Sequence, residues 1–157
     1  MIRRPSYHFA RLAGDNTLQS MMFQSIRHKV RALELYRNLL LQPPDPFSNS
    51  LLSNAEDAEI KMMNRLTVQH ELVFGPVAAY TVEPMDTAFQ TFSDGIILAL
   101  TYNSQSMAFE REAMERLGAE GVGYQLYFYI LLNDMGQQDL LNTLYIYYLH
   151  HFWFINE

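Results

Sequence analysis

A long run without proline or glycine, residues 17–42, constrains the fold more than any other feature of the sequence. Within it, apolar residues recur every three or four positions, which is the spacing of one helix face. Pro43, Pro44 and Pro46 end the run, because proline lacks the amide donor and disfavours helix in the residue before it. Phe47 is then expected to fold back onto the helix end. The sequence predicts a long amphipathic helix whose apolar stripe includes Met22, Ile26, Val30, Leu33, Tyr36 and Leu40.

Near the C-terminal end of this helix, Arg37 lies beside the apolar stripe rather than opposite it, with several leucines around it. A guanidinium at such an edge rests its aliphatic stem on the core and reaches toward an anionic partner. The alternative is an ordinary solvated arginine at a helix edge, which is the commoner outcome for this residue type. The residues alone leave both interpretations open.

The residues after the prolines predict two further helices. The second begins at Ser53 or Asn54, either of which can cap it, and ends before Gly75. The third opens with Pro84, where a missing amide costs nothing, and runs to about residue 102. Gly95, inside this third helix, is either a weak point or a site of close packing.

The last third of the chain is predicted to be helical and is rich in aromatic residues. A fourth helix covers residues 107–117, and two more, 124–133 and 137–154, are separated by a break at 134–136. Tyr and Trp at this density suit a protein interface, where the rings are buried and their polar ends stay hydrated. An ordinary core is the alternative. The residues assigned to an assembly interface are Tyr145, Tyr148, Phe152, Trp153 and Phe154.

The net charge of −6 conceals an asymmetry along the chain. Residues 1–42 carry seven Arg or Lys against two acids, a balance of +5, whereas residues 43–157 carry four against fifteen, a balance of −11. A positive end on an acidic body predicts an acidic partner at that end, with a solvated charged face as the alternative. Residues 1–15 form a basic N-terminal arm whose composition is similar to that of a mitochondrial targeting segment.

The sequence lacks the residues that several kinds of functional site require. The absence of cysteine excludes disulfides, cysteine zinc sites and thiol catalysis. The histidines show no chelating spacing, and no phosphate loop, nucleophile elbow or triad is present, so we expect no metal site and no enzymatic activity. Glu110, Glu112 and Glu115 are interpreted as solvated charge. The composition does not favour nucleic-acid binding, and the lack of a long apolar run predicts membrane contact that is peripheral at most.

The segment from Val30 to Leu40 resembles the signature of the LYR-motif family. It contains an apolar stretch, then Leu35, Tyr36 and Arg37, one spacer residue and two leucines. The resemblance extends over roughly residues 28–100. Further on, the family pattern has an aromatic residue, then a second helix with an arginine, then a third helix that opens on an acidic residue and proline. In this chain the matching residues are Phe47, Arg65, Glu83 and Pro84.

The resemblance implies an all-α fold in which residues 16–103 form a three-helix bundle. LYR-motif proteins are mitochondrial adaptors that bind the mitochondrial acyl carrier protein, whose lipid-bearing phosphopantetheine arm inserts among the helices. The implied function is that of a non-catalytic accessory subunit of a respiratory membrane complex, on the matrix side of the inner membrane, with other subunits as partners. It has no cofactor of its own; an acyl-phosphopantetheine would come with the carrier. Residues 104–157 lack a counterpart in the minimal family and are expected to form an aromatic-rich helical extension that anchors the protein in the assembly.

The resemblance also implies roles for single residues. Arg37 would meet the acidic surface or phosphate of the carrier, Tyr36 would position the pantetheine arm, and Phe47 would close the bundle. The complete set assigned to carrier binding is Arg27, Lys29, Arg31, Leu35, Tyr36, Arg37, Phe47 and Arg65. The alternatives are a LYR-type assembly factor and a soluble helical interaction protein, such as a chaperone or an inhibitor, that binds no carrier. A Bcl-2-like interpretation of residues 92–96 and 134–139 is a minor rival.

Overall fold

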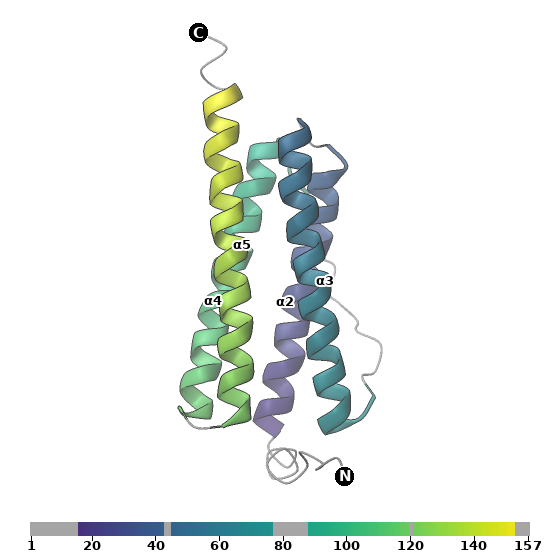
Figure 1. Ribbon diagram of the computed structural model, residues 1–157, viewed down its shortest axis with the longest axis vertical. Helices are drawn as coiled ribbons and strands as arrows, with labels where there is room; N and C mark the ends of the chain where they lie inside the picture. Colours follow the sequence, from purple (N-terminus) through teal and green to yellow (C-terminus); the bar gives the residue numbers. More distant parts are fainter. Residues whose placement is uncertain (1–15, 43–44, 77–87, 120, 153–157) are drawn as a thin grey trace, which may run out of the picture.

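The computed structural model describes residues 16–42, 45–76, 88–119 and 121–152. These residues form four α-helices and no strand, so the predicted all-α class is confirmed for this part of the chain. In Figure 1 the helices lie side by side along one long axis. The helices are α2 (Asn16–Leu40), α3 (Pro46–Phe74), α4 (Phe92–Leu117) and α5 (Val122–Phe152).

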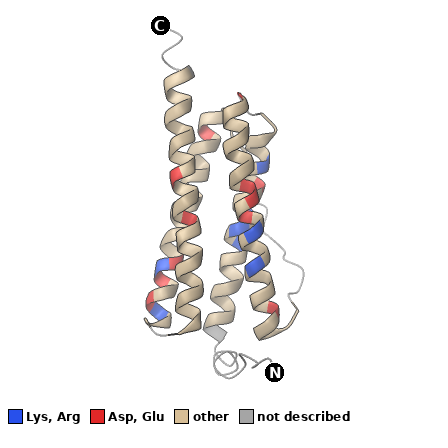
Figure 2. Ribbon diagram, in the orientation of Figure 1, with Lys and Arg blue, Asp and Glu red and all other residues tan. Residues whose placement is uncertain are grey.

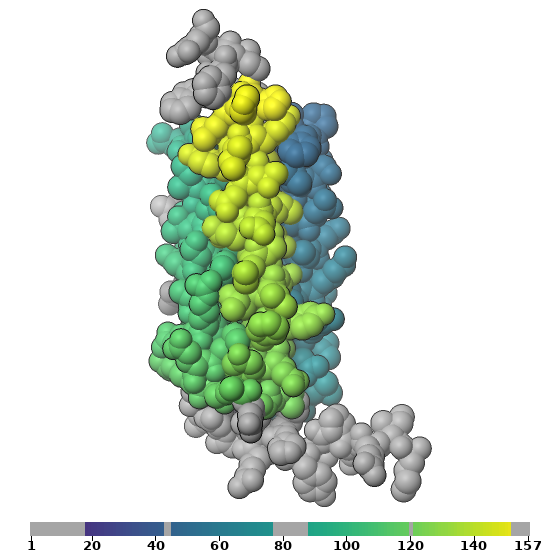
Figure 3. Space-filling model, turned by 60° about the vertical axis from the view of Figure 1, so that its left-hand side comes forward, coloured from purple at the N-terminus to yellow at the C-terminus, as the bar shows by residue number. Residues whose placement is uncertain are grey.

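The four helices pair as two hairpins. The contacts of α2 with α3 and of α4 with α5 are the most extensive, those of α2 with α4 are intermediate, and those of α3 with α5 are smaller. In Figure 1, α3 and α4 run in one direction and α2 and α5 in the other, and the C-terminal turns of α5 extend beyond the ends of its neighbours. Figure 3 shows α5 between α4 and α3 on one face of the molecule.

The start of α3 differs from the prediction. The helix begins at Pro46, one turn or more before the predicted caps at Ser53 and Asn54, and Phe47 belongs to its first turn. Asp45 is the N-cap: its side chain accepts hydrogen bonds from the backbone amides of Phe47 and Ser48, each at 2.9 Å. Pro46 fits the first helical position because no amide is needed there. The proline run therefore ends one helix and also starts the next.

The end of α3 agrees with the prediction. Gly75 follows the helix with a φ of +87°, a backbone conformation that residues with a side chain rarely adopt, and its amide donates to the carbonyl of Glu71 at 3.0 Å. The predicted end of the first helix also holds, since α2 closes at Leu40, just before the prolines.

The predicted third and fourth helices are one helix, α4, which begins at Phe92 behind the N-cap Thr91. Glu83 and Pro84 lie outside the described residues. The polar stretch at 103–106 suggested a break, but it stays helical because it is bonded to α5. The side-chain amide of Asn103 donates to the backbone carbonyl of Asp134 at 2.8 Å, and the Ser106 hydroxyl donates to the Asp134 carboxylate at 2.7 Å.

The two predicted C-terminal helices are likewise one helix, α5, and the expected break at residues 134–136 does not occur. Asp134 is fully buried and faces the other helices, so it is an interior position of a continuous helix and not part of a loop. Gly136 is tolerated within α5, at the modest cost of a glycine in a helix.

The core consists of two apolar layers, one at each end of the bundle, with contributions from all four helices. Leu39 of α2 and Leu144 of α5 belong to the same layer, so α5 completes the core and is not an appendage. The predicted boundary after residue 103 falls in the middle of α4. The fully buried members include Leu18, Met22, Ile26, Leu66, Tyr127 and Ile130 in one layer, and Leu35, Leu39, Leu52, Ile96, Leu141 and Leu144 in the other.

Candidate functional site

Between the two apolar layers lies a polar layer built from all four helices. It contains Lys29 of α2, Glu59 of α3, Glu110 of α4 and Asp134 of α5, and each of these side chains is at most 2% exposed. Burying a charge costs free energy unless the charge is paired, so the contacts within this layer decide its chemistry.

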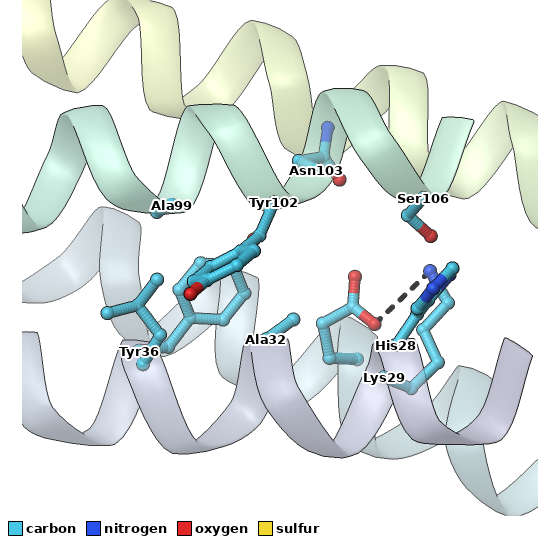
Figure 4. A pocket seen from close by; sticks show the side chains of 10 residues that line it. His28, Lys29, Ala32, Tyr36, Ala99, Tyr102, Asn103 and Ser106 are labelled. Atoms are coloured by element: carbon cyan, nitrogen blue, oxygen red, sulfur yellow. Dashed lines mark ion pairs between the residues drawn. The ribbon is translucent and has the colours of Figure 1, made fainter. Parts of the chain in front are cut away.

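Lys29 is the cation of the polar layer. Its ammonium contacts a carboxylate oxygen of Asp134 and lies 3.4 Å from Oε2 of Glu59, the ion pair drawn as a dashed line in Figure 4. Burial alone would lower the pKa of Lys29, but the neighbouring charges of Glu59 and Asp134 outweigh it and raise that pKa. Lys29 is therefore charged and joins α2 to both α3 and α5.

Asn103 connects the polar layer to the α4–α5 hairpin. Besides its bond to the carbonyl of Asp134, its amide nitrogen lies 2.8 Å from Oε1 of Gln138 and donates to it. The bonds of Asn103 and Ser106 thus fix α4 against α5 at the level of Asp134. Buried hydrogen bonds of this kind favour one arrangement of the helices.

Glu59 and Glu110 are unusual acids because burial raises their pKa values. For Glu59 the pKa rises to about 7, with burial opposed by the positive charge of Lys29. For Glu110 it rises to about 8, again mainly through burial. The Ser25 hydroxyl lies 3.1 and 3.2 Å from the two carboxyl oxygens of Glu110. The prediction that Glu110 is solvated is wrong: its side chain is fully buried.

A small cavity of about 10 Å³ adjoins Lys29 and Glu59. Figure 4 shows that the side chains of Tyr36, Tyr102 and Asn103 surround it. This volume is close to the minimum for one water molecule and far below that of a substrate pocket. His28, which also lines it, has a pKa lowered to about 4 by burial and by the charge of Lys29, so the ring is neutral at pH 7. The polar layer is a closed interior, with no room for a substrate.

Three of the residues assigned to carrier binding lie inside the bundle. Lys29 is in the polar layer, Leu35 is fully buried in an apolar layer, and Tyr36 is 1% exposed beside the cavity. The assignment of these side chains to a partner surface is corrected accordingly. The physical reason is their spacing, because positions 29 and 36 repeat the register of Met22 and Leu33 on the face that α2 turns inward.

Arg37 is exposed. Both interpretations of this residue, a solvated surface arginine and a contact for a partner, require such exposure. Its side chain is 60% exposed, and its Nε donates to Oε1 of Glu56 on α3 at 2.7 Å. Beside it, a groove of about 490 Å³ runs between α2 and α3. The groove is lined by Val30, Leu33, Glu34, Arg37, Asn38 and Met63.

The other arginines assigned to this surface do not form one cluster with Arg37. Arg27 lies over the ring of Phe23, 5.4 Å from its centre, and Arg31 is half-buried. Arg65 lies on the side of α3 that faces α5, with its guanidinium 5.0 Å from the ring centre of Tyr129. In Figure 2, Lys and Arg are found along α2 and α3 and near one end of α4, whereas α5 carries acidic residues only.

The aromatic residues near the end of α5 are divided between core and surface. Tyr145 and Tyr148 are half-buried against an apolar layer, and Phe92 lies 5.6 Å from Tyr148 between ring centres. Phe47 is 43% exposed and packs on Tyr147 of α5, 4.4 Å between ring centres. The side chain of Phe152, together with Trp153 and Phe154, lies outside the described residues.

Sequence reasoning missed Glu59, Glu110 and Asp134, although a signal was present. Each acid occupies a position in the helical repeat of its own buried face, as Glu59 does between Ala55 and Met62. A charged residue at a stripe position has two explanations, an interruption of the stripe or a buried pair, and the sequence does not name the partner. The partners come from other helices and become visible only in the assembled bundle.

Comparisons with protein-family models, with curated proteins and with solved structures found no match to this chain. Among the residues that the structure describes, no three His, Asp or Glu side chains are arranged to hold a metal ion. None of the four described helices is apolar over enough of its length to span a lipid bilayer.

Proposed function

We propose that this chain is a non-catalytic accessory subunit of a mitochondrial respiratory membrane complex and that it docks an acyl carrier protein on the α2–α3 face. The observation that carries the proposal is the position of Arg37, exposed at the rim of a groove whose lining is half apolar. The Leu35-Tyr36-Arg37 segment thereby combines two buried residues that fix the helix with one that is exposed at the surface.

Arg37 is suited to an anionic partner by its chemistry and by its weak present pairing. A guanidinium presents several donors in one plane and binds a phosphate or carboxylate through two bonds at once. Its pair with Glu56 is exposed, and exposed ion pairs contribute only about 0–1 kcal/mol, so exchanging Glu56 for a partner's anion costs little. Val30, Leu33 and Met63 offer an apolar floor next to it.

The proposal for Tyr36 changes with its burial. A tyrosine that is 1% exposed is not available to a pantetheine arm, and burial raises its pKa well above the usual range. We propose instead that Leu35 and Tyr36 anchor α2 in the core so that Arg37 points outward. Arg31, half-buried one to two turns away, remains a supporting residue in the proposal.

The place in a larger assembly is supported by exposed apolar side chains on two helices. These side chains belong to α3 and α5. Such side chains in number are typical of surfaces that meet another protein. They equally fit a helical interaction protein that binds no carrier. The larger ones are Val68, Leu72, Phe128, Tyr129, Leu132, Met135 and Ile146.

Purification of the tagged chain from its native source, followed by intact mass spectrometry of what accompanies it, tests the proposal. We expect to find a small acidic protein whose mass includes an attached phosphopantetheine group. Its level should fall with Arg37→Glu, because the new carboxylate would repel an acidic surface. In the variant, this carboxylate would also lie near Glu34 and Glu56. Arg111→Glu on α4 is the matched control, because Arg111 is also exposed but far along another helix. Thermal melts of both variants verify that the bundle still folds.

Absence of any phosphopantetheine-bearing protein from the wild-type preparation would contradict carrier docking and favour the carrier-free interaction protein. A carrier that is retained equally by Arg37→Glu and Arg111→Glu would place its contact elsewhere on the surface. Respiratory-complex subunits in the same preparation would support the accessory-subunit part of the proposal, and a carrier without them would favour an assembly factor.

A further inference from the structure

We propose that the polar layer is a proton-binding site, in which Glu110, buried and without a cation in contact, holds a proton that the unfolded chain releases. The site would make the stability of the bundle depend on pH. This inference concerns the interior of the protein alone and does not rest on the docking of a carrier.

The balance of charge inside the bundle is the first argument. Three carboxyl groups and one ammonium share a volume that is closed to solvent, so full ionisation would leave two uncompensated negative charges there. Uncompensated buried charge is avoided by taking up protons. Of the other titratable groups near the layer, His28 is neutral and the buried tyrosines have raised pKa values. The half-buried Arg31 is positive, but within the described residues it makes no ion pair with any of the three acids. The charged groups that act on Glu110 are Lys29 from α2, Glu59 from α3 and Asp134 from α5, and Tyr127 of α5 also lies near it.

The contacts of each acid then decide which one keeps a proton. Asp134 contacts the Lys29 ammonium and accepts a hydrogen bond from Ser106, so it is the counter-ion. Glu59 is the next best supported as a negative charge, since the Lys29 ammonium and the Asn133 side-chain amide each lie 3.4 Å from its carboxylate.

Glu110 has the weakest support for a negative charge. Within the described residues its hydrogen-bond partner is the neutral Ser25 hydroxyl, and it makes no ion pair. A hydroxyl serves a protonated carboxyl as well as a carboxylate, because it both donates and accepts. Burial raises the pKa of Glu110 from 4.5 to about 8, the direction expected for an acid without a cation in contact.

A raised pKa in the folded state has a fixed consequence for stability. The folded protein holds a proton on Glu110 that the unfolded chain releases above pH 4.5, so unfolding releases a proton between about pH 4.5 and 8. Stability therefore falls as the pH rises through this window and levels off above it. For one such proton, the folding equilibrium constant falls about tenfold per pH unit. Glu59 adds a similar loss, complete near its pKa of about 7.

The direct measurement is carbon NMR of the wild-type protein with ¹³C-labelled glutamate side chains, followed from pH 5 to pH 9. We expect one carboxyl signal, absent in Glu110→Gln, to keep the chemical shift of a protonated acid at pH 7 and to titrate near pH 8. Glu115, exposed on the same helix, supplies the signal for comparison and is assigned with Glu115→Gln. A Glu110 signal that titrates together with that of Glu115 would overturn the proposal.

Urea unfolding of the two variants supplies an independent readout. Glutamine resembles the neutral acid in shape, so Glu110→Gln should fold and should lose the pH dependence that Glu110 confers. The ratio of the folding constants of Glu110→Gln and Glu115→Gln should rise with pH, approaching tenfold per unit, and stop rising above about pH 8. A ratio that is constant from pH 5.5 to 8.5 would contradict proton binding at Glu110.

Discussion

Lys29 and Arg37 lie on the same helix, about two turns apart, and both contact carboxylates, yet they occupy opposite environments. Lys29 is 2% exposed and joins acids from α3 and α5, whereas the Arg37 side chain is 60% exposed and meets one acid of α3. The difference shows that a basic residue on an amphipathic helix takes its role from its angular position. Lys29 lies on the inward face and joins three helices, whereas Arg37 lies at the exposed edge of α2 and pairs with Glu56 at the surface.

Replacing Lys29 with Met is expected to have the largest effect on stability. The substitution leaves Asp134 and Glu59 buried without their cation, and breaking a buried pair in this way costs roughly 3–5 kcal/mol. We expect Lys29→Met to lower the free energy of unfolding by that amount in urea denaturation at pH 7. The exposed Lys61 gives the matched control, and Lys61→Met is expected to stay within about 0.5 kcal/mol of wild type. Similar losses in both variants would contradict the buried position of Lys29.

Replacing the exposed Arg37 is expected to have only a small effect on stability. Because the Arg37–Glu56 pair is exposed, Arg37→Met should change the free energy of unfolding by at most about 1 kcal/mol. The change should diminish further as salt is raised, since solvent ions screen exposed charges. Urea denaturation at two salt concentrations measures both effects. A loss of several kcal/mol that persists at high salt would mean that Arg37 is a structural residue like Lys29.

Local sequence signals were sufficient for part of the fold. The run without proline or glycine predicts α2, and the prolines and Gly75 predict where α2 and α3 end, because these residues limit the backbone directly. The start of α3 at Asp45 was missed because two later residues, Ser53 and Asn54, are equally good caps on local grounds.

The continuity of α4 and α5 could not be derived locally. Asn103 and Ser106 favour turns when considered alone, and Gly136 suggests a break. In the bundle these preferences are overridden by hydrogen bonds between helices, such as that from Asn103 to the carbonyl of Asp134. The same limit applies to the polar layer. Glu110 has an arginine as its sequence neighbour, but its contact, Ser25, lies 85 positions away in the chain.

The interior position of Lys29 is the claim on which the polar layer depends, and the sequence offers a direct test because Lys29 and Lys61 are its two lysines. Amine acetylation of the native protein near pH 7, followed by peptide mass spectrometry, compares them within one sample. The structure predicts that Lys61 is modified readily while Lys29 stays protected until urea unfolds the bundle. Equal acetylation of the two lysines in the folded protein would contradict the buried ion pair and the polar layer built around it.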